Sequence, residues 1–480
     1  MSGLAVMLLV PTAAAIALAL APGGVFAALI NVGASLATLA ASLVVLADRP
    51  APTELWLIDD LNAYLIVLTA FVMTTTAVFS GGYMGHEVAA GRLSAGALRT
   101  YHALYQALNA AMLLAMAANN VGLLWVAIEA ATLITVIMVS LYRTREAIEA
   151  AWKYFILASV GIALALFGTV LVYLAAQPVI GGGLEAMAWT VLQARAAGFS
   201  PAVLDLAFVF LLVGYGTKVG LAPVHAWLPD AHAEGPTPMS AVLSGLLLNV
   251  ALYALLRFKM VLAGSRAAGT PGPLMIGLGL VSLLFAGLML YRRRDLKRFF
   301  AYSSIEHMGI MTFAFGIGGG LANFAGLFHM AAHSLAKSSI FFAVGGISQV
   351  KGTREIAALS GLTASHPALG WGLVLAVVAI AGAPPFGLFT SEFLIVSSSF
   401  AHAPALTAVF MLGLLVGFAA LVLRVQHIAF GAATPSHAGT AHQATTVVPL
   451  YTHVGLVLIA GLWLPAPLAG WFAAIARLLG

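Results

Sequence analysis

The stretch LLVGYGTKVGLAPVH, residues 211–225, decides the fold of this chain of 480 residues. It is an apolar segment with a lysine, Lys218, near its middle, glycines on both sides of that lysine and a proline after it. Glycine and proline at this density interrupt an α-helix. A broken helix at membrane depth is tolerated only where it is buried in protein or lines a water-filled cavity. The stretch therefore predicts an ion site inside a helical membrane protein.

The composition of the whole chain also indicates a membrane protein. Hydrophobic residues make up 62% of the chain and charged residues only 8%, and the mean hydropathy is +1.04. A soluble domain has about 25% charged residues, so a soluble enzyme, a disordered chain and a nucleic-acid-binding module are excluded. The net charge of +5 comes from basic residues in short loops and does not indicate a polyanionic partner. The absence of cysteine excludes iron–sulfur clusters, c-type haem attachment, thiolate zinc sites and disulfides.

Fourteen segments are long and apolar enough to cross a hydrocarbon core about 30 Å thick, which takes about 20 residues of helix. We expect an all-α polytopic protein, residues 1–480 forming one membrane domain, with residues 177–200 as a short amphipathic connector. The first segment lacks a positively charged start, so we expect it to be a retained span and not a signal peptide. The predicted spans are 4–22, 25–47, 60–82, 101–118, 120–142, 152–176, 203–224, 238–261, 273–291, 299–318, 321–348, 367–395, 403–429 and 447–466.

The distribution of Lys and Arg predicts the orientation of these spans. Loops and adjoining helix ends that follow odd-numbered spans hold thirteen basic residues, and those that follow even-numbered spans hold five. The basic run RRRDLKR, residues 292–298, belongs to the first group and is expected to be an anchor on the positive side. We therefore expect the odd-to-even loops in the cytoplasm and both termini on the outer face.

A second interrupted span, AGAPPFGLFTSEF at residues 381–393, carries Glu392. An ordinary proline kink would explain one such span more easily than two. The seventh and twelfth spans are five apart, so the two would cross the membrane in opposite directions, as in transporters built from inverted repeats. We expect two inverted five-helix repeats at 101–262 and 273–430, with N-terminal helices at 1–100 and a C-terminal helix at 431–480.

Four ionisable residues other than histidine lie well inside predicted spans: Glu129, Lys218, Lys337 and Glu392. A charge in mid-bilayer costs at least about 2.5–3.5 kcal/mol. These residues therefore indicate a functional pathway with partners or water, although buried ion pairs that only fix helix packing are the alternative.

The eleventh span reads HMAAHSLAK, residues 329–337. Its spacing of four residues places His329, His333 and Lys337 on one stripe of a helix. Such a stripe can relay protons through water. Haem ligation is an alternative, but it usually needs histidines from facing helices and no matching pair is found in another span. A polar packing seam is the other alternative.

The loop HAWLPDAHAEGPTP, residues 225–238, holds His225, His232, one Asp and one Glu. The spacing matches no metal-ligand signature. A cytoplasm-facing site of proton uptake or a helix-capping loop explains it better, and we expect no metal and no cofactor in this chain.

These residues resemble the antiporter-like, proton-conducting subunits shared by respiratory complex I, Mrp-type Na⁺/H⁺ antiporters and group 4 membrane-bound hydrogenases. The resemblance covers about residues 55–430, and it implies a fold of fourteen helices with two inverted five-helix repeats. It rests on four motifs: WVAIE at 125–129, GTKVGLAPVHAWLPDAH at 216–232, DLKRFFAYSSIEHMG at 295–309, and the stripe at 329–337.

The resemblance assigns roles to individual residues. It implies that Glu129 pairs with the broken-helix lysine Lys218. It further implies that the 329–337 stripe is the family's central hydrophilic axis and that Glu392 is the ionisable residue of the twelfth span. The eighth span departs from the pattern: it carries Asn249 where the family usually has Lys or His, and Asn cannot titrate. A relay there must use water or a substitute group. Asn249 together with SIEH, residues 304–307 with His307 at the end, resembles most the F-type subunit of hydrogenase-4-like complexes.

The resemblance implies a proton-translocating membrane subunit of an energy-converting redox complex, hydrogenase- or NADH dehydrogenase-like, with no catalytic centre of its own. The alternatives are a Mrp-type Na⁺/H⁺ antiporter subunit, the membrane subunit of an inorganic-carbon transporter, and a purely structural scaffold with a vestigial axis. The implied partners are other membrane subunits, the lipid bilayer and H⁺ or Na⁺, with no nucleic acid. The implied location is the inner cell membrane of a bacterium or archaeon.

Overall fold

The computed structural model describes residues 2–20, 24–435 and 444–480. Over these residues the chain consists of helices, turns and isolated bridges, with no β-strand. The α-helices are α1 (Gly3–Leu20), α2 (Val25–Ala47), α3 (Asp60–Ala89), α4 (Ala95–Ala117), α5 (Val121–Val139), α6 (Arg145–Ile180), α7 (Trp189–Arg195), α8 (Pro201–Val219), α9 (Trp227–Glu234), α10 (Thr237–Val242), α11 (Leu248–Ala263), α12 (Pro271–Leu290), α13 (Leu296–Ile317), α14 (Gly319–Lys351), α15 (Leu362–Ser365), α16 (Pro367–Ile380), α17 (Gly387–His402), α18 (Pro404–Ala429), α19 (Ala444–Leu462) and α20 (Ala466–Leu478).

The all-α polytopic fold is confirmed. Each of the fourteen predicted spans overlaps one helix or a pair of consecutive helices, and residues 21 and 22 of the first span lie outside the described residues. Within the described ranges, ten helical segments are long and apolar enough to cross a membrane by length and composition. The helices α13 and α14 are not among these ten, although they are 22 and 33 residues long. They carry buried polar side chains that lower their hydropathy, among them His307 on α13 and His329, His333 and Lys337 on α14. The connector at 177–200 contains the short helix α7, which buries Trp189 and Leu192 and exposes Arg195, as expected.

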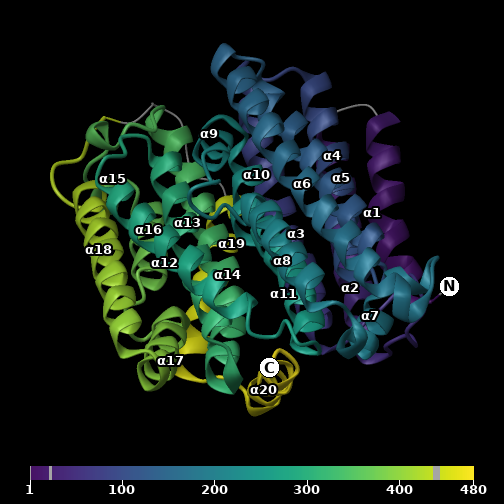
Figure 1. The fold of residues 1–480 in the computed structure, drawn as a ribbon. Coiled ribbons are helices and arrows are strands. Elements are labelled where there is room, and N and C mark those ends of the chain that lie inside the picture. Colours follow the sequence, from purple (N-terminus) through teal and green to yellow (C-terminus); the bar gives the residue numbers. More distant parts are fainter. Residues whose placement is uncertain (1, 21–23, 436–443) are drawn as a thin grey trace.

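The long helices run side by side, from α18 at one edge of the molecule to α1 at the other, with α3, α8, α11 and α14 between them (Figure 1). The short helix α20 lies across the lower end of this bundle and was not expected from the sequence (Figure 1). It buries Phe472, Ile475 and Ala476. The described part of the region 431–480, residues 431–435 and 444–480, therefore contains two helices where we expected one.

The two breaks predicted from glycine and proline are present. The helix α8 ends at Val219, and Gly220 has φ +81°, a left-handed conformation that glycine adopts without a steric penalty. The chain then turns before α9. In the same way α16 ends at Ile380, Gly382 has φ +70°, and α17 begins only at Gly387.

Side-chain caps fix where α5, which carries Glu129, and α13, which carries Glu306, begin. The Asn120 side chain accepts hydrogen bonds from the backbone N–H groups of Gly122 and Leu123 at 3.0 Å, at the start of α5. The Asp295 side chain accepts one from the N–H of Arg298 at 2.9 Å, at the start of α13. Such caps satisfy donors that the first helical turn leaves without partners.

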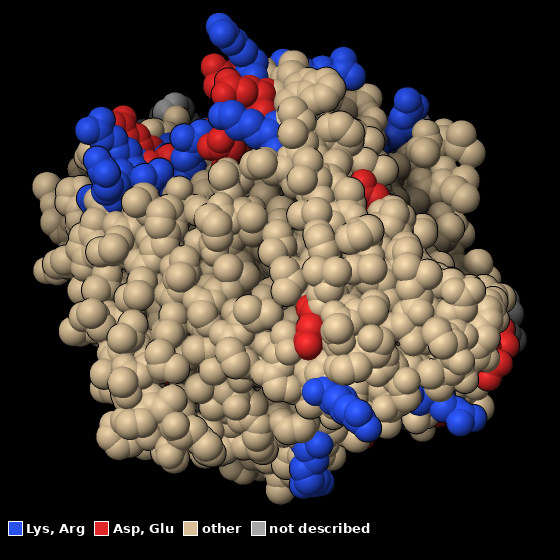
Figure 2. Space-filling view, in the orientation of Figure 1, with Lys and Arg blue, Asp and Glu red and all other residues tan. Residues whose placement is uncertain are grey.

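The surface separates into charged ends and an apolar belt. Figure 2 shows most Lys and Arg gathered at the upper end, fewer at the lower end, and a broad, nearly uncharged region between them. Large apolar side chains are exposed on several helices, among them Trp152 and Ile156 of α6, Phe393 of α17 and Leu415 of α18. A belt of this kind suits contact with lipid chains. The chain is therefore a multi-pass membrane protein.

Candidate ion pathway

The broken helix α8 presents Lys218 to α5. The Lys218 Nζ donates a hydrogen bond to Thr132 Oγ1 at 2.5 Å and lies 3.9 Å from Glu129 Oε2. Thr132 and Glu129 are three residues apart and so lie on the same face of α5. The side chain of Lys218 is 5% exposed and that of Glu129 is 19% exposed. The two expected residues are thus brought together as an ion pair at the break.

The stripe of α14 is completely buried. His329, His333 and Lys337 all have 0% exposure. Nδ1 of His307, from α13, lies 3.0 Å from Nε2 of His329, at hydrogen-bond distance. The ring centroids of His307 and His333 are 5.5 Å apart. The histidines of two helices therefore form one cluster.

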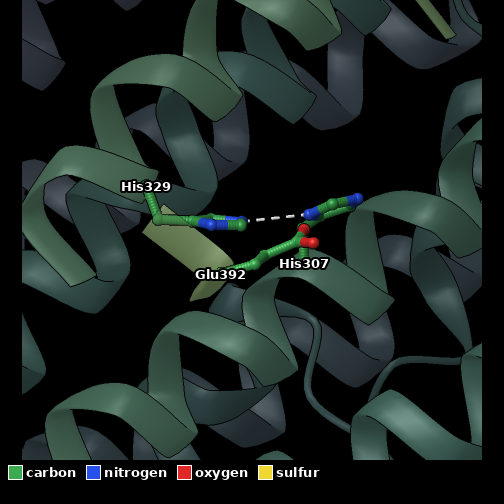
Figure 3. Close-up of side chains that lie close together, drawn as sticks. All are labelled: His307, His329 and Glu392. Carbon is green, nitrogen blue, oxygen red and sulfur yellow. Dashed lines mark hydrogen bonds between the residues drawn. The ribbon is translucent and has the colours of Figure 1, made fainter. Parts of the chain in front are cut away.

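Glu392 joins this cluster from α17. Figure 3 shows its carboxylate beside the rings of His307 and His329, and the possible ligand atoms of the three residues lie within 4.8 Å of one another. Two histidines and one carboxylate at this spacing can ligate a metal ion. However, the imidazoles already share a hydrogen bond, and the other ring nitrogen of His329 contacts Ser391 Oγ at 2.9 Å. Their polar contacts are thus accounted for without an ion, and we interpret the trio as part of the polar axis.

Lys337 ends the stripe in a confined site. Its Nζ donates a hydrogen bond to the carbonyl of Phe300 at 3.1 Å. No carboxylate oxygen lies within 4.0 Å of it in the part of the chain that the structure describes. The ammonium group is therefore buried without a direct ion pair.

Asn249 reaches the axis helix. Its side-chain nitrogen donates hydrogen bonds to Ser334 Oγ at 2.9 Å and to the carbonyl of Met330 at 3.3 Å. A π-helical turn, Leu243–Leu247, precedes it. The side chain thus contacts α14 at Met330 and Ser334, and an amide contributes no proton-accepting step.

His225 and His232 are buried but are not part of the cluster. The ring of His225 packs edge-on against Phe285 at 4.8 Å, and the ring of His232 stacks on Phe341 at 5.0 Å. Asp230, in the same loop segment, forms ion pairs with two other helices: it lies 3.1 Å from Arg298 of α13 and 3.4 Å from Lys153 of α6. Among the described residues, the group of possible metal ligands that lie close together comes from other helices and includes no residue of this loop.

Sequence reasoning did not select two buried charges next to the axis. Lys297 was expected to be a surface anchor, yet it is 2% exposed and donates a hydrogen bond to the carbonyl of Gly235. Glu306 is the other, on α13 next to His307. Both belong to the motif at 295–309, and the signal that could have singled them out is a charge inside an otherwise apolar segment.

A polar cavity of about 450 Å³ reaches Lys297 from the basic end of the molecule. Its walls include Glu87 and Arg92 of the α3–α4 region and Glu234 of α9, together with Arg354. Tyr142 and Gln349 contact Glu87 at 3.0 and 2.9 Å. The cavity therefore brings a hydrophilic surface close to the helices that carry the axis.

Comparison with known proteins places this geometry in a family. Residues 118–417 match the family model described as the NADH:quinone oxidoreductase/Mrp antiporter transmembrane region. The chain belongs to this family. It is 57% identical over 431 residues, 90% of each chain, to the hydrogenase-4 component F homolog of Methylacidiphilum infernorum (isolate V4). The family resemblance drawn from the motifs is thus confirmed.

Solved structures of low sequence identity share the family fold. One is a chain of the membrane-bound sulfane sulfur reductase, an archaeal respiratory membrane complex, with TM-score 0.87 and 22% identity, covering 100% of this chain and 98% of that one. Another belongs to respiratory complex I from Thermus thermophilus, with TM-score 0.83 and 21% identity, covering 99% and 100%. These relatives are subunits of multi-subunit membrane complexes.

Proposed function

We propose that this chain is a proton-translocating, antiporter-like membrane subunit of an energy-converting redox complex of the hydrogenase or NADH dehydrogenase kind. The observation that carries the proposal is the buried pair of Glu129 and Lys218 at a broken helix, with a file of polar side chains in the same protein core. Membership of the family and the 57% identity to a hydrogenase-4 component F homolog favour the same assignment.

The pair acts as a switch. While Glu129 stays close, its negative charge stabilises the ammonium form of Lys218. When the carboxylate moves away, the lysine is left buried with one hydroxyl partner, Thr132. Burial disfavours the charged form of the amine, so the proton leaves. The two residues titrate as a unit.

Protons follow the axis from one repeat to the other. They enter from the cytoplasm near Lys218, where His225 and His232 serve uptake, and cross by His333 and Lys337. They leave beside Glu392. Water fills the gaps between these side chains during transport, since proton transfer needs hydrogen-bond contact, directly or through one water.

The proposed orientation of the chain in the membrane follows from the charges of its loops. The basic ends of the helices face the cytoplasm, and both termini face outward. The start of α1 and the end of α20 lie toward the end of the molecule opposite the main basic end (Figures 1 and 2), which supports this orientation. The repeats span 101–262 and 273–430, and redox chemistry in partner subunits biases the switch. The membrane is the inner cell membrane of a bacterium or archaeon.

The test replaces Lys218 by Met in the assembled complex and measures proton uptake into vesicles driven by the redox substrate. Removal of the relay group is expected to slow translocation about a hundredfold, the lower range for a positioned proton carrier. Arg99→Met is the control, because Arg99 is an exposed basic residue near the start of α4. Wild-type translocation by K218M in an intact complex would refute the proposal. A dependence of the flux on Na⁺ would favour the Mrp-type antiporter instead.

A further inference from the structure

Glu306 is a buried acid whose carboxylate packs against a glycine of a neighbouring helix. Its side chain is 3% exposed, and its Oε2 atom has no hydrogen-bond partner among the residues that the structure describes. The carboxylate lies directly against α18 at Gly417, where an added Cβ would be 1.5 Å from Oε1. Any residue other than glycine at 417 would therefore displace the carboxylate.

The charged and titratable groups around Glu306 come from three helices. Lys337 of α14 and Glu392 of α17 both interact electrostatically with it. On its own helix, His307 follows it in sequence and contacts His329, which in turn neighbours His333. Glu306 is also the carboxylate whose charge acts on Lys337. Its charge thus acts on both the buried lysine of α14 and the buried acid of α17.

The order of helices gives Glu306 a counterpart. In the first proposed repeat, α5 is followed by the 36-residue helix α6 and the broken helix α8. In the second, α13 is followed by the 33-residue helix α14 and the broken pair α16 and α17. The helix α13 therefore corresponds to α5. Glu306 lies on the equivalent of the helix that holds Glu129, and each acid acts on one buried lysine.

We propose that Glu306 is a proton carrier of the second repeat, which takes protons from Lys337 and passes them toward Glu392. This inference rests on the proposed function. A proton passes from the Lys337 ammonium to the Glu306 carboxylate, through a water or after a side-chain rotation. One N–H bond breaks and one O–H bond forms, leaving a neutral amine and a neutral carboxylic acid. Glu306 then releases the proton toward Glu392, and the axis reprotonates Lys337.

The main test is Glu306→Gln, which keeps the size of the side chain and removes its titration. We expect redox-driven proton translocation in vesicles to fall about a hundredfold in an assembled complex. Glu185→Gln, on the exposed connector, is the control. Infrared difference spectra should lose the carbonyl band of a protonated carboxylic acid in E306Q. Wild-type translocation, or lost translocation with an unchanged band, would overturn the inference.

A second substitution keeps this test decisive. If E306Q does not assemble, Glu306→Asp decides: a shifted carboxylic acid band is expected, and an unchanged band overturns the assignment.

K218M in the same assay separates the two proposals. If K218M is inactive and E306Q is fully active, only this inference fails. If K218M is fully active, the proposed function fails, and this inference fails with the proposed function.

Discussion

Replacement of Glu129 by Gln tests the switch by removing the negative charge that faces Lys218. The Lys218 Nζ and Glu129 Oε2 atoms are 3.9 Å apart. At an effective dielectric constant of about 20, two unit charges at that distance attract by about 4 kcal/mol. This energy corresponds to a factor of about a thousand in an equilibrium constant. E129Q should therefore weaken the hold of Lys218 on its proton by up to that factor, and the lysine should remain neutral for most of the cycle.

The assay follows the initial rate of acidification inside proteoliposomes that contain the complete complex. We expect E129Q to slow it about a hundredfold and Glu129→Asp to retain part of the wild-type rate, because Asp keeps the charge at a longer distance. Glu149→Gln is the matched control, since Glu149 is 60% exposed and pairs with a surface lysine. A wild-type rate in E129Q, with the complex intact, would refute the reasoning about the pair.

Three more predictions concern stability, hydration and partners. Arg257 donates two hydrogen bonds to Asp59, at 2.6 and 2.8 Å, so Arg257→Met should lower the unfolding free energy by about 3 kcal/mol in thermal denaturation. Burial would raise the pKa of Asp59, but Arg257 outweighs it and holds that pKa below its ordinary value. The contribution of the pair is therefore present above the ordinary pKa of Asp and lost as the pH falls through the lowered pKa, and the difference between R257M and wild type should close in acid. A high-resolution map of the complex should show ordered waters between His333 and Glu392, and a dry apolar plug there would contradict the pathway. Mass spectrometry of the purified complex should find hydrogenase or iron–sulfur subunits, and a set of small membrane subunits alone would favour the antiporter.

The sequence predicted the features that depend on local chemistry. Gly220 and Gly382 follow the two helix ends where glycine and proline indicated breaks. The spacing of four residues placed His329, His333 and Lys337 on one stripe, because helical periodicity alone decides this. These features need no knowledge of which helices touch.

The remaining features depend on contacts between distant parts of the chain. Glu306 and Gly417 are more than a hundred residues apart, and only the packing of α13 beside α18 reveals that the acid has a fitted site. Arg257 is buried, and its partner Asp59, almost two hundred residues earlier, precedes α3. The pairing of Glu129 with Lys218 came from a family resemblance, since the residues alone indicated only that each needed a partner or water.

The most direct measurement is the number of protons moved per electron pair by the complete complex, compared between wild type and K218M in the same vesicles. If this chain carries protons through Lys218, the ratio falls in K218M while the uncoupler-released electron transfer rate stays high. An unchanged ratio in K218M would show that the protons cross elsewhere and that the buried lysine serves packing alone.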